Sequence, residues 1–236
     1  MTGKAIHRAS GATVTPEEFI RREGPQYRDK GIYPECIVCG SVLHPYGVNS
    51  TNVTARFDHP DRTDCLLSST PNPRYIHLQP SDWDLAAGKR LRETICRLEN
   101  IKQAYAVCRA LCFNHLKVPE FLEMFREGDR KRIWAYKGLQ EWVAPYILVT
   151  LVDLEPNGKR RFPLRFVLRK PARQPIDAMW VSPEDCALEP VFADSGRPMA
   201  RDPIVLSDDR IEAARADTAW IPDVMTKRLK ECCAHR

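Results

Sequence analysis

Apolar residues recur at helical spacing through the middle of the chain. Over residues 91–115 they lie three or four positions apart, which is the period of one face of an α-helix. The members of this stripe are Leu91, Ile95, Leu98, Ile101, Tyr105, Cys108, Cys112 and His115. Pro119 suits the first turn of a second helix, because its missing N–H would be unpaired there in any case. The pattern therefore predicts a helical region over residues 82–140.

The period changes to two in the last third of the chain. Residues 146–154 are rich in residues that favour strands, and residues 161–169 alternate between apolar and basic side chains. Asn157-Gly158 between these runs is typical of a tight hairpin turn. We therefore predict an antiparallel β-rich region over residues 145–236, with a short helix near residues 223–233.

The first 80 residues have a weaker apolar pattern. Residues 15–18 combine a capping threonine, a proline at the first helical position and a later glutamate, which predicts a short helix ending at Gly24-Pro25. Residues 31–80 are rich in Cys, His, Pro, Asn and Thr, with strand-like pieces such as residues 53–57. This segment has too few apolar residues for a core of its own, so it needs a cross-link such as a bound metal. The expected fold class is α+β, with a zinc-ribbon-like module over residues 1–80, central helices and a C-terminal antiparallel β-rich region.

Composition narrows the class of protein. The 236 residues are 43% apolar and 28% charged, which is enough for a core without disulfides. The N-terminus lacks a secretory signal, and the longest strongly apolar run is too short to span a membrane. Nine clustered cysteines favour metal binding over a disulfide framework. We expect a soluble, cytoplasmic protein, whose net charge of +5 permits nucleic-acid partners but does not demand them.

The N-terminal module carries the strongest chemical signal. Cys36 and Cys39 are separated by two residues and can turn back onto one ion, with Gly40 easing the turn. A structural zinc site has four tetrahedral ligands, and His59 and Cys65 supply the second pair. The alternatives are unrelated polar residues in a loop or a redox CxxC, which usually accompanies a βαβ pattern that is missing here. We predict that these residues bind Zn2+.

The stretch YPECIVCGSVLHPYGVNSTNVTARFDHPDRTDC resembles the N-terminal zinc-ribbon module of competence-protein-CoiA-like bacterial proteins. Those modules pair a CxxCG knuckle with a later HFxH-like element and often a downstream Cys. The resemblance covers about residues 12–70 and favours His59 over the rival ligand His44. Arg56 stands where the family often has a second His, and the rest of the chain carries over no catalytic residue. The combination of a zinc-finger module with a basic remainder of the chain is also similar to bacterial anti-phage zinc-finger ribonucleases, which are activated by phage ring assemblies.

An HNH-type metal-dependent nuclease is an alternative interpretation of the same module. HNH nucleases place a CxxC before an Asp-His pair whose His activates water beside a metal. Asp58-His59 would be that pair, Asn72 the middle Asn, and residues 111–117 the later Cys-His element. Against this, the second cysteine cluster comes too late in the chain and on a predicted helix, and Cys65 has no role in the pattern.

Three further residues raise the question of a second metal site. Cys108, Cys112 and His115 stand at i, i+4 and i+7 and would share one helix face. Cys96 is the obvious fourth ligand, but twelve helical residues place it ~120° around and ~18 Å along the axis. We favour core packing for this face, because free Cys behaves as a small buried hydrophobe.

A basic segment is the candidate nucleic-acid-binding surface. Residues 159–173 contain seven basic residues and no acidic one. Alternation sends Phe162 to the apolar face and Arg161, Arg165 and Arg169 to the other, spaced ~13 Å apart along a strand. The predicted phosphate-binding residues are Lys159, Arg160, Arg161, Arg165 and Arg169. The alternatives are a solvated face or pairing with the downstream acidic residues Glu184, Asp185, Glu189, Asp194 and Asp202.

These features together predict a zinc-finger nucleic-acid-binding protein. RNA is preferred over DNA because no recognition helix for a DNA major groove stands out. A ribonuclease effector of phage defence is the enzymatic form of this hypothesis, with His77 and Arg165 as catalytic candidates. The alternative is a non-catalytic, zinc-stapled interaction module. Expected partners are RNA and either a protein trigger or a second copy of the chain, without a membrane.

Overall fold

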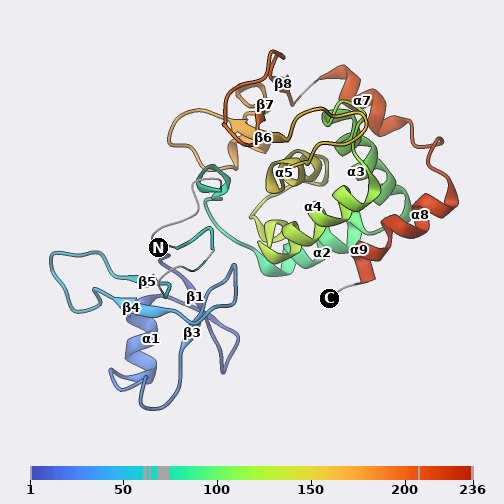
Figure 1. The fold of residues 1–236 in the computed structure, drawn as a ribbon. Coiled ribbons are helices and arrows are strands. Elements are labelled where there is room, and N and C mark those ends of the chain that lie inside the picture. Colours follow the sequence, from blue (N-terminus) through green and yellow to red (C-terminus); the bar gives the residue numbers. More distant parts are fainter. Residues whose placement is uncertain (1, 61–62, 64, 69–74, 207, 235–236) are drawn as a thin grey trace. The chain divides into compact units, whose positions relative to one another are not determined.

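The chain is described by a computed structural model covering residues 2–60, 63, 65–68, 75–206 and 208–234 (Figure 1). Residue contacts divide it into two compact units, Met1–Gln79 and Pro80–Arg236. Both combine helices with small antiparallel sheets, which confirms the expected α+β class. The boundary expected near residues 140–145 falls inside the second unit. In the described ranges, no helix is both long enough and apolar enough to traverse a bilayer.

The first unit is built from short elements. They are β1 (Ala5–His7), β2 (Thr13–Val14), α1 (Pro16–Glu23), β3 (Pro34–Glu35), β4 (His44–Tyr46), β5 (Arg56–Asp58) and the 3-10 turn η1 (Ile76–Leu78). One sheet has the order β2-β1-β3 and the other pairs β4 with β5, both antiparallel. Phe19 on α1 packs edge-on against Tyr27 and Phe57, forming a small aromatic core.

Helix α1 begins and ends as its sequence predicts. The Thr15 side chain accepts from the N–H of Glu18, and the Glu18 carboxylate accepts from the N–H of Thr15. Gly24 then closes the helix with φ = 81°, a conformation that costs glycine little. The predicted capping box is therefore confirmed.

The second unit is mainly helical. Its elements are α2 (Leu85–Ile95), α3 (Leu98–Leu111), α4 (Val118–Arg130), η2 (Ile133–Ala135), η3 (Glu141–Val143), α5 (Ala144–Leu151), β6 (Leu164–Arg169), α6 (Ala178–Val181), η4 (Pro183–Asp185), β7 (Ala187–Phe192), β8 (Ile204–Val205), α7 (Asp209–Ala216), α8 (Asp223–Leu229) and α9 (Glu231–Ala234). The sheet has the antiparallel order β6-β7-β8. Helix α4 opens with Pro119 in its first turn, as predicted, and α8 and α9 are the expected terminal helix in two pieces.

The central apolar stripe is interrupted, so the prediction of one continuous helical stripe is wrong. Arg97 has an extended backbone between α2 and α3, and the Asn100 side chain donates to the carbonyl of Thr94 at 3.0 Å. The same carbonyl accepts from the N–H of Arg97 at 3.0 Å, instead of from the N–H four residues on that a continuing helix would supply. His115 lies beyond the end of α3 and does not share its face.

Residues 146–154, predicted as a strand, form most of helix α5 instead. All eight residues of α5 are buried, because α3, α4 and β6 pack around it (Figure 1). A helix buried on every side has no polar face, so its sequence shows no 3.6-residue period. The loop containing Asn157-Gly158 reverses the chain, and Leu154 and Leu164 pair at its ends, but it connects a helix to a strand.

Strand β6 keeps the predicted alternation. Leu164, Phe166 and Leu168 are buried, and β6 pairs with β7 from Leu164 opposite Phe192 to Arg169 opposite Ala187. Phe162, expected on the same buried face, lies before the strand and is 48% exposed. The strand prediction is therefore right from Leu164 onward.

Candidate functional sites

The four predicted metal ligands lie together in the first unit. The ligand atoms of Cys36, Cys39, His59 and Cys65 are all within 4.8 Å of one another and could hold a metal ion. The Cys36 and Cys65 sulfurs are 3.7 Å apart, and the Cys39 sulfur is 3.5 Å from His59 Nε2. A tetrahedral ion with Zn–S bonds of ~2.3 Å and a Zn–N bond of ~2.0 Å has S···S edges of ~3.8 Å and S···N edges of ~3.5 Å. The donor set fits such an ion, and these two separations match its edges.

The first thiol pair is shaped by a tight backbone turn. The Cys36 N–H donates to the Ser41 carbonyl at 2.8 Å, and the Gly40 N–H donates back to the Cys36 carbonyl at 2.9 Å. Gly40 has φ = 71°, the left-handed conformation that the turn requires. The Val38 N–H points at the Cys36 sulfur, 3.3 Å away, and would stabilise a thiolate there.

The second pair comes from a strand end and another turn. His59 follows β5 directly, and the Leu67 N–H donates to the Cys65 sulfur at 3.4 Å. The Ser68 N–H reaches the Cys65 carbonyl, so this turn resembles the first one. Cys36, Cys65 and His59 are buried, and His59 Nδ1 has no hydrogen-bond partner among the described residues.

The pKa values of the clustered side chains His59, Cys39 and Cys65 are shifted in different directions. Burial opposes the charged His59 ring, but hydrogen bonds and charge from Cys36 and Cys39 outweigh it and raise the pKa of His59 to about 9. Hydrogen bonds from neighbouring thiols lower the pKa of Cys39 and raise that of Cys65. The site therefore retains protons at neutral pH that a bound cation would displace.

The surroundings of His44 do not suit a metal ligand, and those of Asp58-His59 do not suit an HNH catalytic pair. His44 lies in β4 with its ring 5.9 Å from Tyr33, outside the ligand cluster, and burial and the Arg28 charge lower its pKa. Asp58 accepts from Arg56 Nε at 3.0 Å. His59 Nε2 faces the thiols, whereas an HNH base would face water. Asn72 lies outside the described residues.

The second cysteine set packs as a core. Cys108 and Cys112 are fully buried, and the Cys108 thiol donates to the Pro145 carbonyl at 3.6 Å. Burial raises the pKa of both thiols. Across the described residues, no metal-ligating cluster includes them or His115. Cys232 is also buried, in α9, and its thiol donates to the Leu229 carbonyl at 2.9 Å.

Two arginines of the basic strand are paired internally. Arg165 makes two hydrogen bonds with Asp153, at 2.7 and 2.8 Å. Arg169 pairs in the same two-point manner with Glu189 on β7. The Arg169–Glu189 pair matches the alternative of pairing with the downstream acids, whereas Asp153 lies upstream of the strand and was not among them. Both pairs leave less charge at these positions for a phosphate.

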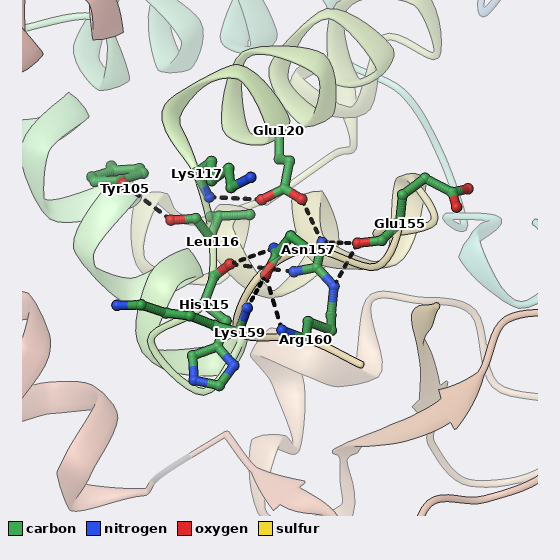
Figure 2. Close-up of polar contacts among 9 residues, drawn as sticks. All are labelled: Tyr105, His115, Leu116, Lys117, Glu120, Glu155, Asn157, Lys159 and Arg160. Carbon is green, nitrogen blue, oxygen red and sulfur yellow. Dashed lines mark hydrogen bonds and ion pairs between the residues drawn. The ribbon is translucent and has the colours of Figure 1, made fainter. Parts of the chain in front are cut away.

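Arg160 is buried and holds two segments of the second unit together. It is only 7% exposed, pairs with Glu120 at the start of α4, and donates to the carbonyls of Glu155 and His115 at 2.9 and 3.3 Å. Figure 2 shows its guanidinium between these groups, with Asn157 also reaching the His115 carbonyl. Arg160 therefore ties the loop before β6 to the segment after α3.

The two segments that Arg160 joins form the walls of a cavity of about 360 Å³. Its cationic lining comes from Lys159, Arg161 and Arg201, which are exposed, together with the paired Arg160. The aromatic and imidazole lining is supplied by Phe113, His115, Phe162 and Phe192. No acidic side chain is among the described residues that line it. We call this cavity the basic pocket.

The backbone is strained at Phe113, which lines the basic pocket, and at the next residue. Phe113 and Asn114 have φ values of 55° and 62°, a conformation that is unfavourable for a bulky residue such as Phe. The strain turns the Phe113 ring under the Arg201 guanidinium, 4.1 Å from the ring centroid. Arg161 lies 5.3 Å from the Phe162 ring. Cations and aromatic faces thus alternate around the pocket.

Several of these residues were not predicted from the sequence. Phe113 lies within the segment compared with the HNH element but had no role of its own there, and Arg201 belongs to no predicted motif. Neither proposed catalytic candidate is among the described residues that line the pocket: His77 is in η1 of the first unit, and Arg165 on β6 pairs with Asp153. Lys159 and Arg161 are the two predicted phosphate-binding residues that line the pocket as exposed cations.

No family model matches the chain, and no curated protein or solved structure is similar to it. The resemblance of residues 12–70 to CoiA-like zinc-ribbon modules stays a prediction.

Proposed function

We propose that this chain is a zinc-stapled protein that binds single-stranded RNA in the basic pocket. The observation that carries the proposal is the set of exposed cations, Lys159, Arg161 and Arg201, interleaved with aromatic rings in one cavity. Single-stranded RNA presents phosphates and unstacked bases together, and proteins meet them with cations and aromatic faces.

The metal in this proposal is Zn2+ with a structural role. Three thiols and one imidazole clustered within 4.8 Å are a donor set that zinc prefers, and four protein ligands leave no open position for a substrate. The first unit has short strands and a small aromatic core, so a metal would supply much of its stability. RNA binding is assigned to the second unit alone.

The basic residues of this region differ in whether a carboxylate pairs with them. Within the described part of the chain, no carboxylate pairs with Lys159, Arg161 or Arg201, so these side chains are the expected phosphate contacts. Arg160 positions the walls of the pocket through Glu120 and the His115 carbonyl. Arg169, which is paired with Glu189, is expected to contribute little.

The test is the salt dependence of RNA affinity, measured by fluorescence anisotropy with a labelled single-stranded RNA and a DNA of the same sequence. We expect tighter binding of RNA and a steep loss of affinity with salt. Arg161→Ala and Arg201→Ala should each lower the salt slope by about one, whereas Arg169→Ala, the matched paired arginine, should leave it unchanged.

Phe162→Ala should weaken RNA binding by ~1–3 kcal/mol through lost base stacking, with the salt slope preserved. Binding that is absent or insensitive to salt, or equal effects of Arg161→Ala and Arg169→Ala, would contradict the proposal.

Cleavage of the bound RNA is a second candidate, favoured by the His115 imidazole in the lining of the same pocket. A neutral imidazole there would take the 2′-hydroxyl proton as the 2′-oxygen bonds to phosphorus, and Lys159 and Arg161 would stabilise the charge on the phosphoryl oxygens. The P–O5′ bond would then break, and the 5′-oxygen would leave with that proton. Products with 2′,3′-cyclic phosphate ends, lost in His115→Ala without loss of affinity, are the expected result. Intact RNA after long incubation would leave binding without catalysis.

A further inference from the structure

The turn between β1 and β2 holds a serine, a histidine and a glutamate in one hydrogen-bonded chain. The Ser10 hydroxyl lies 3.0 Å from His7 Nδ1, and His7 Nε2 lies 2.8 Å from a carboxylate oxygen of Glu23 at the end of α1. An ionised carboxylate only accepts, so in the neutral imidazole the proton is on Nε2 and Nδ1 is left as an acceptor. The Ser10 O–H is then the donor to His7.

Two further groups donate hydrogen bonds to the Ser10 oxygen, which leaves the hydroxyl hydrogen for His7. Arg22 Nη1 and the Ala12 N–H both donate to Ser10 Oγ, at 3.3 and 3.4 Å. These contacts leave the hydroxyl hydrogen directed to His7, and the half-exposed Arg22 side chain releases Oγ when its lone pair attacks a substrate. A nucleophile that contacts a base, which is itself oriented by a carboxylate, is the arrangement used for nucleophilic catalysis by serine.

The base is held rigidly and the nucleophile is accessible. His7 is 2% exposed, and its ring lies 5.9 Å from the buried Phe19 ring. Its backbone N–H donates to the Ala12 carbonyl, and its carbonyl accepts from the N–H groups of Ser10 and Gly11. Ser10 itself is exposed on the turn. A fixed base beside an exposed hydroxyl needs little rearrangement before reaction.

We propose that Ser10 is an activated nucleophile that is acylated by small activated esters and then released by hydrolysis. The Ser10 O–H proton passes to His7 Nδ1 while Oγ forms a bond to the carbonyl carbon. The ester C–O bond breaks, and the leaving alcohol takes that proton. Water then attacks the acyl-serine by the same route, giving a carboxylic acid and free Ser10. Arg22, adjacent to Oγ, is the cation placed to stabilise the oxyanion.

A purely structural role is the competing explanation, because a buried His–Glu pair also ties β1 to α1. The two explanations differ in the reactivity of Ser10. A structural pair needs no reactive hydroxyl, whereas an activated serine reacts with a fluorophosphonate far faster than other serines on the same protein.

The test uses the full-length, zinc-loaded chain with a fluorophosphonate probe, read by intact mass and by mapping the labelled peptide. We expect one label per chain, on Ser10, and none on Ser10→Ala. Glu23→Gln should slow labelling about 10-fold or more, because the imidazole loses its charged partner. Arg22→Gln, at a half-exposed position that should not affect folding, should slow it several-fold. Ser81→Ala is the matched control, since Ser81 contacts the Asp177 carboxylate without an imidazole, and should label like the wild type.

Zinc content and circular dichroism establish that each variant is folded. A folded wild type that remains unlabelled at Ser10, or labels equally fast as Arg22→Gln and Glu23→Gln, would overturn the proposal. RNA affinity is expected to be unchanged in Ser10→Ala, so this test is independent of the basic pocket.

Discussion

Two sets of cysteine and histidine residues in this chain look alike in sequence and differ in structure. Cys36, Cys39, His59 and Cys65 converge on one point, because two tight turns and a strand end bring their side chains together. Cys108 on α3 and Cys112 at its C-cap are buried in the hydrophobic core, with His115 further beyond the helix end. Ligand convergence thus depends on reversals of the chain, which a helix does not provide.

The two sets also stabilise their units by different means. The first unit has short strands and would depend on its metal, whereas the second surrounds the fully buried helix α5 with helices and a sheet. Removing a thiol from the first set should therefore abolish a structure, and removing one from the second should weaken a packed core.

The largest expected effect is that of Cys36→Ser. Losing one of four ligands should reduce bound zinc from one equivalent to none and unfold the first unit, because zinc binding contributes about 10–16 kcal/mol in comparable small modules. Metal analysis combined with circular dichroism measures both. Treating the wild type with a chelator should give the same result, while Cys112→Ser should keep its zinc. A Cys36→Ser protein that retains one equivalent of zinc would remove the basis of the metal assignment.

A smaller effect is expected for Cys112→Ser in the second unit. A hydroxyl in place of this fully buried thiol would be desolvated, at a cost of about 1–3 kcal/mol. Urea denaturation, followed by a probe in the second unit, measures the change. The half-buried Cys233→Ser should remain within about 0.5 kcal/mol of the wild type. If Cys112→Ser lost zinc instead of stability, the second set would be a metal site after all.

The third prediction concerns the pH dependence of zinc affinity. Zinc binds Cys36, Cys39 and Cys65 as thiolates, and in the unfolded, zinc-free unit thiols hold their protons below a pKa of about 8.5. Zinc must displace these protons. Affinity should therefore increase with pH by about 10-fold per unit for each proton released. Competition titrations with a chromophoric chelator between pH 6.5 and 8.5 measure this slope, and a flat profile would show that no proton is displaced.

Local signals in the sequence were sufficient where short-range chemistry decides the structure. The capping box at Thr15 and Glu18 and the alternation of Leu164, Phe166 and Leu168 appear in the structure as predicted. They succeed because caps and strand alternation depend on residues a few positions apart. Helix α5 was mistaken for a strand because its environment is apolar on every side, and the apolar period that distinguishes the two vanishes in such an environment.

The sequence by itself determined the four candidate ligands, the α+β class and the basic character of residues 159–161. Only the tertiary structure decided which cations are left for a ligand, because pairing with Asp153, Glu189 and Glu120 depends on neighbours distant in the chain. It also brought Phe113 and Arg201 together, and set Ser10 and His7 against Glu23. The physical reason is the range of the interactions: ligand identity and periodicity are local properties, while charge pairing and cavity shape arise only after distant segments pack.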